Sequence, residues 1–413
     1  MFPVILGTDI NAYGVARSFH EAYGVKSLCI GRKALRYTRS SKILEVMVIS
    51  NFDEDTVFLK TLKEIGEKYK EQKLLLISCG DGYTSLMAKY ENELKDLFSF
   101  NIVTNQQQQE LENKIDFYKI CEQYGLDYPE TLLISKEMVE KKVSLPFEYP
   151  VALKPNDSIS YLDLNFPGKK KAYKIETEEE LNKVLQDIYK SGYKDYMIAQ
   201  DFIPGDSDTM AVLNAYVNRK GKVKMMCLGQ CLLDAVLPAE IGNYNALVTV
   251  DGEKIYPQYQ KFLEDYGYRG FANFDLKYDI RDGKYKVFEI NIRQGRSSYY
   301  MTAGGCNFTK FLVDDLVEKK DEPVYYHKKR GLWLYVDPYV LKKYVPRSIF
   351  PMAKAELKRG FAFTQWYEKD RNFTRFLDYI RRRLSSIKIY HYYGKKSSGS
   401  VGGEMIGRTG EKR

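Results

Sequence analysis

The chain has 413 residues, of which 44% are hydrophobic and 29% are charged, a composition that is ordinary for a folded, soluble protein of two or three domains. No apolar run approaches the roughly 18 residues that a membrane-spanning helix needs. The N-terminal segment MFPVILGTDIN lacks the basic start and the small-residue cleavage site of a signal peptide. We therefore expect a cytoplasmic protein.

The net charge of +9 is concentrated at the C-terminal end. Residues 371–413 contain eleven Lys and Arg against three acidic residues, so this segment alone accounts for +8. The nearly neutral remainder argues against nucleic acid as a partner of the main body. The sequence does not define an oligomeric state.

The first hundred residues alternate strand-like and helix-like segments. The strand-like segments are FPVILGTD (2–9), KSLCIG (26–31) and KLLLISCGDGY (73–83), and the helix-like segments are NAYGVARSFHEAYG (11–24) and VFLKTLKEIGEKYKEQ (57–72). This alternation indicates a parallel α/β sheet, in a domain that we assign to residues 1–104. Gly7 and the Gly80-Asp81-Gly82 turn would then lie at the carboxyl ends of strands, where open α/β sheets bind ligands; tight turning alone is the other explanation of these glycines.

A second domain is predicted over residues 105–319. It contains a long helix over 104–126, a strand at 149–155, an amphipathic helix at 176–193, a strand at 196–205 and a closing helix near 319. Two hairpins are predicted to turn at Lys220-Gly221 and at Asp282-Gly283. Residues 320–413 form an aromatic and basic extension, and its Gly/Ser-rich end is expected to be disordered.

The second hairpin carries two acids and an amide. Asp275 and Glu289 lie on facing strands across a short turn, and alternation places Asn291 on the same sheet face as Glu289. Asp275 shares that face if the hairpin register allows. The apolar residues assigned to the opposite face are Phe274, Leu276, Phe288 and Ile290. Oxygen donors brought together in this way suit Mg²⁺, with Mn²⁺ as an alternative, particularly when substrate phosphates complete the coordination. A solvated hairpin with its acids facing water is the competing interpretation.

Other polar residues lie at the ends of predicted strands. Lys154 ends the buried strand VALK and either extends to solvent or points at an anion. The segment AQDFIPG (199–205) offers a backbone edge and Phe202 to an adenine ring, or is only a strand that leads into a turn. Arg293 and Arg296 follow the acid-bearing strand and, unless they are ordinary surface arginines, suit an acidic substrate or a phosphoryl group.

The order of these motifs resembles the ATP-grasp superfamily. Lys114 near a helix start, VALKP, QDFIPGD, NFD and FEINIR follow one another across residues 105–319. The resemblance implies an α/β fold in which an N-terminal pre-ATP-grasp domain precedes two ATP-grasp subdomains with the nucleotide bound between them. It assigns a small lid subdomain to residues 150–200 and a metal-binding subdomain to residues 201–319.

Carried over residue by residue, the resemblance implies ATP and Mg²⁺ as cofactors. Lys114 and Lys154 match the lysines that hold the ATP phosphates. The residues that match the adenine-binding hinge are Gln200, Asp201, Phe202 and Ile203, and the ribose contact matches Asp206 or Asp208. The residues that match the magnesium ligands are Asp275, Glu289 and Asn291. The expected catalytic groups are Lys154, Arg293 and Arg296.

Two features depart from the ATP-grasp pattern. Many members carry a Gly-rich phosphate loop between the strand lysine and the hinge, whereas residues 156–172 contain a single glycine and three consecutive lysines. The way in which this loop covers the phosphates is therefore not implied. Where D-alanine–D-alanine ligases place an arginine two residues before the first metal-binding acid, this chain has Asn273, and Arg293 or Arg296 would supply that charge.

A narrower resemblance covers most of residues 4–318. Segments that carry it include GTDINAYGVARSFHEAYG, QDFIPGDSDTMAVLNAYV, GFANFDLKYD and FEINIRQGRSSYY. They are similar to the D-aspartate ligases of Gram-positive cell-wall synthesis. Those enzymes activate the β-carboxylate of D-aspartate with ATP and join it to the lysine ε-amine of a peptidoglycan stem-peptide precursor. The alternatives are an ATP-grasp ligase for another amino acid and another amine, and a non-catalytic ATP-binding protein.

The basic tail contains an amphipathic pattern over residues 371–393. The apolar positions at helical spacing are Phe373, Phe376, Leu377, Ile380, Leu384 and Ile387, with arginines largely elsewhere. One interpretation is a helix packed on the body with a solvated basic face. Another is peripheral contact with an anionic membrane at its inner face.

Overall fold

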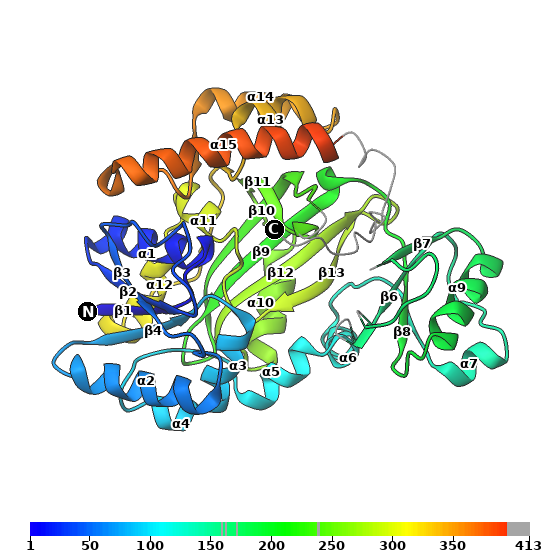
Figure 1. Ribbon diagram of the computed structural model, residues 1–413, viewed down its shortest axis with the longest axis horizontal. Coiled ribbons are helices and arrows are strands. Elements are labelled where there is room, and N and C mark those ends of the chain that lie inside the picture. The colour runs from blue at the N-terminus through cyan, green and yellow to red at the C-terminus, as the bar shows by residue number, and fades with distance from the viewer. Residues whose placement is uncertain (158–159, 162, 171, 238–239, 395–413) are drawn as a thin grey trace, which may run out of the picture.

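The computed structural model describes residues 1–157, 160–161, 163–170, 172–237 and 240–394. Its N-terminal sheet has the order β3-β2-β1-β4 with all pairs parallel (Figure 1), which confirms the predicted α/β character. The strands are β1 (Phe2–Leu6), β2 (Ser27–Gly31), β3 (Leu44–Val48) and β4 (Leu74–Ser78). The helices of this region are α1 (Ile10–Tyr23), α2 (Asp55–Lys68), α3 (Asp81–Lys89) and α4 (Glu91–Leu94). Strand β3 and the helices α3 and α4 were not anticipated from the sequence.

The long helix expected over 104–126 is two helices, α5 (Asn105–Glu112) and α6 (Lys114–Tyr124). They are separated by Asn113, whose extended backbone interrupts the helical pattern. The Asn113 side chain accepts hydrogen bonds from the backbone N–H groups of Ile115 and Asp116 and so caps α6. The interruption makes Lys114 the first residue of a helix.

A four-stranded antiparallel sheet follows, in the order β5-β8-β6-β7. Its strands are β5 (Thr131–Ile134), β6 (Val151–Pro155), β7 (Tyr173–Ile175) and β8 (Met197–Asp201), and the helices α7 (Lys136–Glu140) and α9 (Glu178–Lys190) pack with it. This unit lies at one end of the molecule in Figure 1. Because β5 belongs to it, the unit begins earlier than the predicted lid boundary at residue 150.

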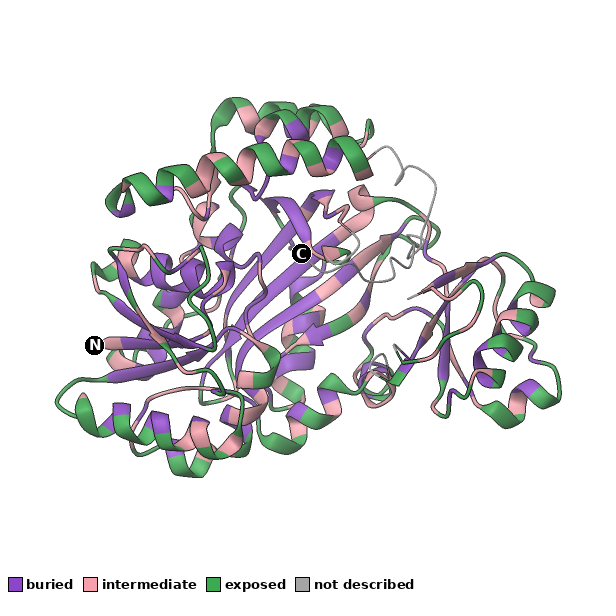
Figure 2. Cartoon of the chain, viewed as in Figure 1, coloured by how far each residue is buried: buried purple, intermediate pink, exposed green. Residues whose placement is uncertain are grey.

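The third sheet is the centre of the molecule and has eight strands. Seven run in the order β13-β12-β9-β10-β11-β15-β16, and β14 pairs with β10. The strands are β9 (Met210–Val217), β10 (Val223–Asp234), β11 (Tyr244–Val250), β12 (Gly270–Asp279), β13 (Lys284–Asn291), β14 (Tyr325–Tyr326), β15 (Leu332–Leu334) and β16 (Phe361–Phe363). Both predicted hairpins are confirmed, and Figure 2 shows that these strands are largely buried. Since β14 to β16 come from residues beyond 319, the extension is not separate from the central sheet.

Helices cover both faces of the central sheet. One core cluster joins α10 (Tyr256–Asp265) to the sheet, and a second contains residues of α1, α11 (Tyr299–Ala303) and α12 (Thr309–Val313), which a π-helix (Asp314–Glu318) continues. Two 3₁₀ turns lie at Ser207–Thr209 and Glu368–Asp370. The sheet face that packs on α1 and α11 is the one that carries the predicted site.

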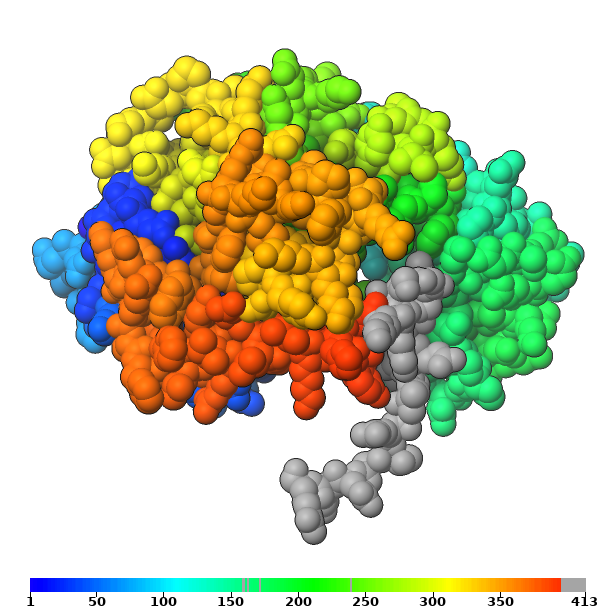
Figure 3. Space-filling view, turned by 90° about the horizontal axis from the view of Figure 1, so that it is seen from above, coloured from blue at the N-terminus to red at the C-terminus, as the bar shows by residue number. Residues whose placement is uncertain are grey.

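The extension also forms α13 (Pro338–Tyr344), α14 (Phe350–Arg359) and α15 (Phe373–Tyr393). These helices lie together along one side of the molecule, and Figure 3 shows the extension beside the blue N-terminal part. Within the described residues, no helix has both the length and the apolar character needed to cross a bilayer. The end predicted to be disordered, residues 395–413, lies outside the described part of the chain.

Helix α15 packs on the body, as one interpretation of its pattern expected, but through a different face. Arg375, Ser386 and Tyr390 are buried against the protein, whereas Phe373 is 75% and Leu384 62% exposed. The prediction of a solvated basic face is therefore wrong for this helix. The reason is that aromatic rings and buried acids of the body receive the arginines, a partnership that periodicity does not reveal.

Candidate active site

The hairpin of β12 and β13 places two carboxylates opposite each other. Asp275 pairs with Glu289 in the strand register, and Asn273 pairs with Asn291. The Tyr244 hydroxyl donates a hydrogen bond of 2.9 Å to Asp275 Oδ1. Burial and the neighbouring Glu289 raise the pKa of Asp275, because both disfavour its charged form. Such a pair favours a cation between the two strands.

The apolar side of the same hairpin differs from the prediction at one position. A register shift after Asp275 sets Leu276 opposite Val287, which is fully buried, whereas Phe288 is only half-buried. The irregularity, a β-bulge, changes which residue of β13 faces the core. The same shift sets Asp275 opposite Glu289, where an unshifted ladder would set it opposite Phe288.

The donor set near these carboxylates is small. Among the described residues, no three His, Cys, Asp or Glu side chains gather into a metal-binding group. Asn291 presents its amide N–H to Asp275 Oδ2 at 3.4 Å, while its oxygen accepts from Arg293 at 3.3 Å. A cation needs the side-chain oxygen of Asn291 as its ligand in place of this N–H group. A half-turn of the Asn291 amide brings that oxygen toward Asp275. The set of two carboxylates and one amide fits a divalent cation whose remaining ligands come from a substrate.

Lys154 on β6 faces this group. Burial and then Lys114 lower the pKa of Lys154 to about 7, whereas Glu289 acts in the opposite direction. Lys114 and Glu289, two further residues predicted for the site, therefore lie close enough to Lys154 to influence its charge. Two lysines beside a carboxylate pair provide a cationic environment for phosphates.

The predicted hinge follows β8, and its polar side chains are held by the protein. The buried Gln200 amide donates to Thr131 Oγ1 at 2.9 Å. The carboxylate of Asp201 accepts two hydrogen bonds from Arg281, one of them 3.0 Å long. Ile203 is buried at 2% exposure. These partners fix the end of β8 against the β12–β13 turn, so nucleotide contacts here would use the main chain and apolar surface.

Phe202 is flanked by two cations. Lys174 Nζ and Lys277 Nζ lie 5.1 Å and 5.5 Å from the centre of its ring. Of the two candidates for the ribose contact, Asp206 is exposed, whereas Asp208 accepts a hydrogen bond from the Ser348 hydroxyl of the extension. Both carboxylates lie near Lys277. Burial lowers the pKa of Lys277, and the negative charges of nearby acids, Asp206 and Asp208 among them, oppose that decrease.

Arg293 joins the hairpin to the N-terminal domain. Its Nε and Nη2 donate hydrogen bonds of 2.6 Å and 3.0 Å to the two carboxylate oxygens of Asp81. Asp81 is the central residue of the Gly-Asp-Gly turn and the first residue of α3. The turn thus faces the site, as the location at a strand end suggested. Arg293 also donates to the Asn291 side-chain oxygen, so it lies at the end of the cluster that contains Asn291.

Arg296 lies near Asp9, as Arg293 does. Burial raises the pKa of Asp9, and the positive charges of Arg293 and Arg296 oppose that rise. The Arg296 guanidinium lies 4.2 Å from the centre of the Tyr335 ring, and its Nη2 is 3.8 Å from a carboxylate oxygen of Glu240. The site therefore extends from the hairpin, past the N-terminus of α1, to the C-terminal extension.

Sequence reasoning missed several residues that complete this arrangement. They are Asp9, Tyr244, Tyr335 and Arg382. Asp9 ends the GTD motif after β1, so its place at a strand end was a usable signal. The other three come from strands and a helix without a recognisable motif. Only the tertiary contacts connect them to the site.

Solved structures with a similar fold are ATP-grasp enzymes. An L-amino acid ligase from Bacillus licheniformis matches with TM-score 0.52 and 14% identity, over 76% of this chain and 74% of that chain. An N5-carboxyaminoimidazole synthetase from Staphylococcus aureus, in complex with ADP, matches with TM-score 0.58 and 14% identity, over 80% and 81%. A biotin carboxylase domain from Hydrogenobacter thermophilus, in complex with MgADP, matches with TM-score 0.55 and 14% identity, over 80% and 72%.

The fold is therefore that of ATP-grasp enzymes. No family model matches the chain. A curated relative, D-aspartate ligase of Enterococcus faecium (strain Aus0004), is 45% identical over 404 residues, which cover 95% of this chain and 94% of that protein. The chain is a carboxylate–amine ligase that depends on ATP. It belongs to the D-aspartate ligase family.

Proposed function

We propose that this enzyme activates the β-carboxylate of D-aspartate with ATP and joins it to the lysine ε-amine of a peptidoglycan stem-peptide precursor. The observation that carries the choice of substrate is the 45% identity, over nearly the whole chain, to an enzyme named for D-aspartate. A cluster of carboxylates, lysines and arginines at the end of the β12–β13 hairpin supports the same chemistry.

ATP and Mg²⁺ are the proposed cofactors, with Mn²⁺ as a substitute. The proposed metal ligands are Asp275, Glu289 and Asn291, and the raised pKa of Asp275 is a physical sign that the carboxylate pair lacks a neutralising charge. The proposed phosphate-binding residues are Lys114 and Lys154. The adenine would lie against Gln200, Asp201, Phe202 and Ile203, with the ribose near Asp206 or Asp208. When bound, the metal ion neutralises phosphate charge and keeps the phosphoryl group electrophilic.

The reaction proposed has two steps. An oxygen of the substrate β-carboxylate attacks the γ-phosphorus of ATP, the bond from that phosphorus to the β,γ-bridging oxygen breaks, and ADP leaves with an acyl phosphate formed. The neutral lysine amine then attacks the acyl carbon, the bond from carbon to the phosphate oxygen breaks, and inorganic phosphate and one proton are released. This chain's residues bind and orient both partners, which is the main requirement of phosphoryl transfer.

Three cationic side chains have separate tasks in this proposal. Lys154 offsets the charge of the phosphates, since it lies beside Glu289. Arg293, held by Asp81 and reaching Asn291, stabilises the transferring phosphoryl group. Arg296, further from the metal ligands, grips the acidic substrate through its planar fork.

The test is an ADP-release screen of D- and L-amino acids with the purified full chain, ATP, Mg²⁺ and a nucleotide-linked peptidoglycan precursor. D-aspartate is expected to give the fastest ADP release, and the product mass should increase by one aspartyl residue. Faster release with another amino acid or amine would make the enzyme a ligase of different specificity. ATP binding without ADP release for any pair would contradict catalysis.

We also propose that the reaction takes place in the cytoplasm, where ATP is available, and that α15 rests on the inner face of the membrane. Support comes from its outward residues: Phe373 is 75%, Phe376 44% and Leu384 62% exposed. Arg381, 65% exposed, supplies positive charge beside this apolar face. An apolar stripe with adjacent basic side chains is typical of helices that lie on anionic bilayers.

A further inference from the structure

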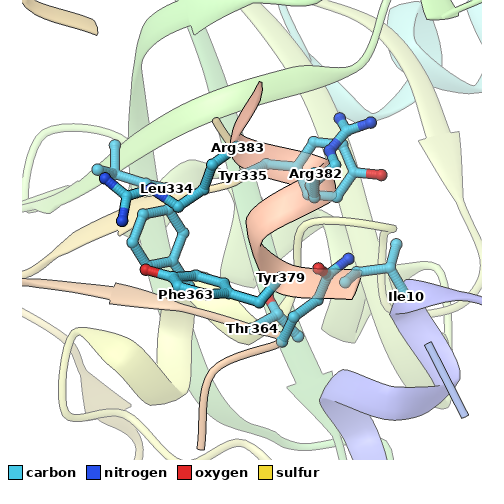
Figure 4. A pocket seen from close by; sticks show the side chains of 9 residues that line it. Ile10, Leu334, Tyr335, Phe363, Thr364, Tyr379, Arg382 and Arg383 are labelled. Atoms are coloured by element: carbon cyan, nitrogen blue, oxygen red, sulfur yellow. The ribbon is translucent and has the colours of Figure 1, made fainter. Parts of the chain in front are cut away.

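Arg382 turns inward from α15 onto an aromatic ring. Its guanidinium lies 3.7 Å from the centre of the Tyr335 ring, and Figure 4 shows it beside that ring under the helix. Arg296 lies 4.2 Å from the centre of the same ring. Both guanidinium groups therefore contact the same aromatic ring. One tyrosine thus holds an arginine of the central loop and an arginine of the C-terminal helix.

Arg382 is unusual among the arginines of its helix. Arg375 pairs with Asp370, Arg381 with Asp378 and Arg383 with Asp337. Within the described residues, Arg382 has neither an acidic partner nor a hydrogen bond, and its Nε is buried. Buried N–H groups of a guanidinium normally have acceptors, because burial without one is costly.

Arg296 shares this deficit. Its Nη1 is also buried without an acceptor in the described part of the chain, and its only acidic contact is the 3.8 Å approach of Glu240 to Nη2. Two positive charges on one ring repel each other, and the aromatic faces compensate only in part. An anion at the edge of Tyr335 would satisfy both buried groups and relieve the repulsion.

The location connects this pair of arginines to the reacting centre. Arg382 and Tyr335 line a pocket together with Ile10, the residue that follows Asp9 (Figure 4). The Tyr335 backbone N–H donates to the Asn245 carbonyl at 2.9 Å. The preceding residue, Tyr244, is the one that donates to Asp275. Tyr335 is therefore joined through β11 to Tyr244, the hydrogen-bond partner of Asp275. Arg296 is not among the residues that line this pocket and approaches the Tyr335 ring separately.

We propose that Arg382, together with Arg296, binds the carboxylate of the acidic amino acid that is not phosphorylated. This inference rests on the proposed function, in which a substrate with two carboxylates is activated at one of them. Arg293 reaches Asn291, a proposed metal ligand, and suits the reacting carboxylate, whereas Arg296 and Arg382 lie at the Tyr335 ring. The C-terminal helix then contributes directly to the choice of an amino acid with a second acidic group.

The experiment compares Arg382→Ala with Arg381→Ala, the exposed neighbour on the same helix, in the full chain. Each is assayed with D-aspartate and with 3-aminopropanoate, which retains the reacting carboxylate and the amine but lacks the α-carboxylate. We expect Arg382→Ala to lower kcat/KM for D-aspartate by about 10- to 100-fold, the usual effect of losing a charged hydrogen bond. Its kcat/KM for 3-aminopropanoate and its KM for ATP should stay at wild-type values. Arg381→Ala should match wild type with both substrates.

The outcomes separate the inference from the proposed function. No ADP release by the wild type with D-aspartate would refute the proposed function. If the wild type is active, two results would refute the role of Arg382. In one, Arg382→Ala lowers kcat/KM equally for D-aspartate and 3-aminopropanoate. In the other, Arg382→Ala raises only the KM for the amine acceptor. Arg382→Lys, which keeps the charge but not the fork, should retain the fold and lose an intermediate part of the preference for D-aspartate. An unchanged preference in Arg382→Lys and Arg382→Ala would also refute it.

Discussion

Asp275 and Glu289 carry the most direct prediction at the scale of single residues. Glu289→Gln keeps the shape of the side chain and removes one of two facing charges, so ADP release should fall by about 10²- to 10³-fold. The melting temperature should not fall, because Glu289 raises the pKa of Asp275 through repulsion that the variant lacks. Steady-state assays and thermal melts measure both quantities.

Glu253→Gln is the matched control, since Glu253 is 76% exposed and pairs with Lys328 at the surface. It should behave as wild type in both assays. Near-normal turnover of purified Glu289→Gln would contradict its role as a metal ligand.

The lowered pKa of Lys154 predicts that nucleotide binding is linked to proton uptake. Its pKa is lowered to about 7 by burial and by Lys114, so at about pH 8 it is mostly neutral in the ligand-free protein. Phosphates beside it should raise that pKa, and nucleotide binding should then take up close to one proton. Calorimetric titration in buffers of different ionisation enthalpy measures the uptake.

The control for this titration is Lys194→Met, an exposed lysine of the same sheet unit, which should retain the proton uptake. Lys154→Met should lose it. The unfolded chain keeps the ordinary lysine pKa of 10.5 and so binds more protons than the folded chain between pH 7 and 10.5. Stability of the ligand-free wild type should rise with pH across this window on account of Lys154, and Lys154→Met should lack that contribution. A titration with no buffer dependence would count against phosphate contact.

At the scale of elements, the β12–β13 turn anchors the nucleotide hinge. Arg281 in this turn donates to Asp201 at the end of β8 and also pairs with Asp279, which is 1% exposed. Arg281 holds the pKa of Asp279 well below its usual range. Arg281→Ala should raise KM for ATP several-fold and lower the free energy of unfolding by about 1–3 kcal/mol.

The neighbouring Lys284→Ala serves as its control, because it removes only an exposed ion pair with Asp127. That change should leave KM for ATP unchanged and stability within about 1 kcal/mol of wild type. Equal effects of the two variants on KM would show that the turn does not position the hinge.

At the scale of the whole molecule, Asp370 and Arg375 join the two ends of the chain. Arg375 Nε lies 3.2 Å from Asp370 Oδ2, and both side chains are almost fully buried. Asp370 also accepts from the hydroxyls of Tyr13 and Ser41 at 2.8 Å. Arg375→Ala leaves that carboxylate without its charged partner and should cost about 3–5 kcal/mol in urea unfolding.

Arg371→Ala, an exposed arginine over the Trp366 ring, should change stability by less than about 1 kcal/mol. If the two arginine variants unfolded at the same urea concentration, the buried ion pair would not be what holds the extension to the N-terminal domain.

The outward face of α15 predicts membrane association of the intact chain. Full-length protein should co-sediment with vesicles that contain anionic lipid, and the double change Phe373→Ser and Leu384→Ser should reduce the bound fraction, because both side chains are largely exposed. Tyr339→Ser, which removes an exposed aromatic residue of α13, is the control. Equal binding by the wild type and the double variant would rule out contact through this face.

The sequence alone determined the parts of this protein that depend on neighbours along the chain. The sequence sufficed to place the hairpin turn at Asp282-Gly283, and the order of motifs sufficed for the ATP-grasp fold. Whether Asp275 lies opposite Glu289 depended on the hairpin register, which the shift between Asp275 and Leu276 decides. The break at Asn113 and the β-bulge that buries Val287 in place of Phe288 were missed, because a cap and a register shift alter periodicity by a single residue. Both features arise from a few neighbouring residues, but neither leaves a sequence pattern strong enough to predict it.

Only the tertiary structure decided which distant charges meet. Asp9, Arg296, Tyr335 and Arg382 come from four separate segments, and no spacing rule relates them. Helix α15 shows the reason: Arg375, Arg382 and Arg383 turn toward the body because Asp370, Tyr335 and Asp337 receive them, whereas Arg381 stays exposed. The partners therefore determine which face docks. Electrostatic and aromatic contacts depend on distance in space, whereas a sequence pattern reports distance along the chain.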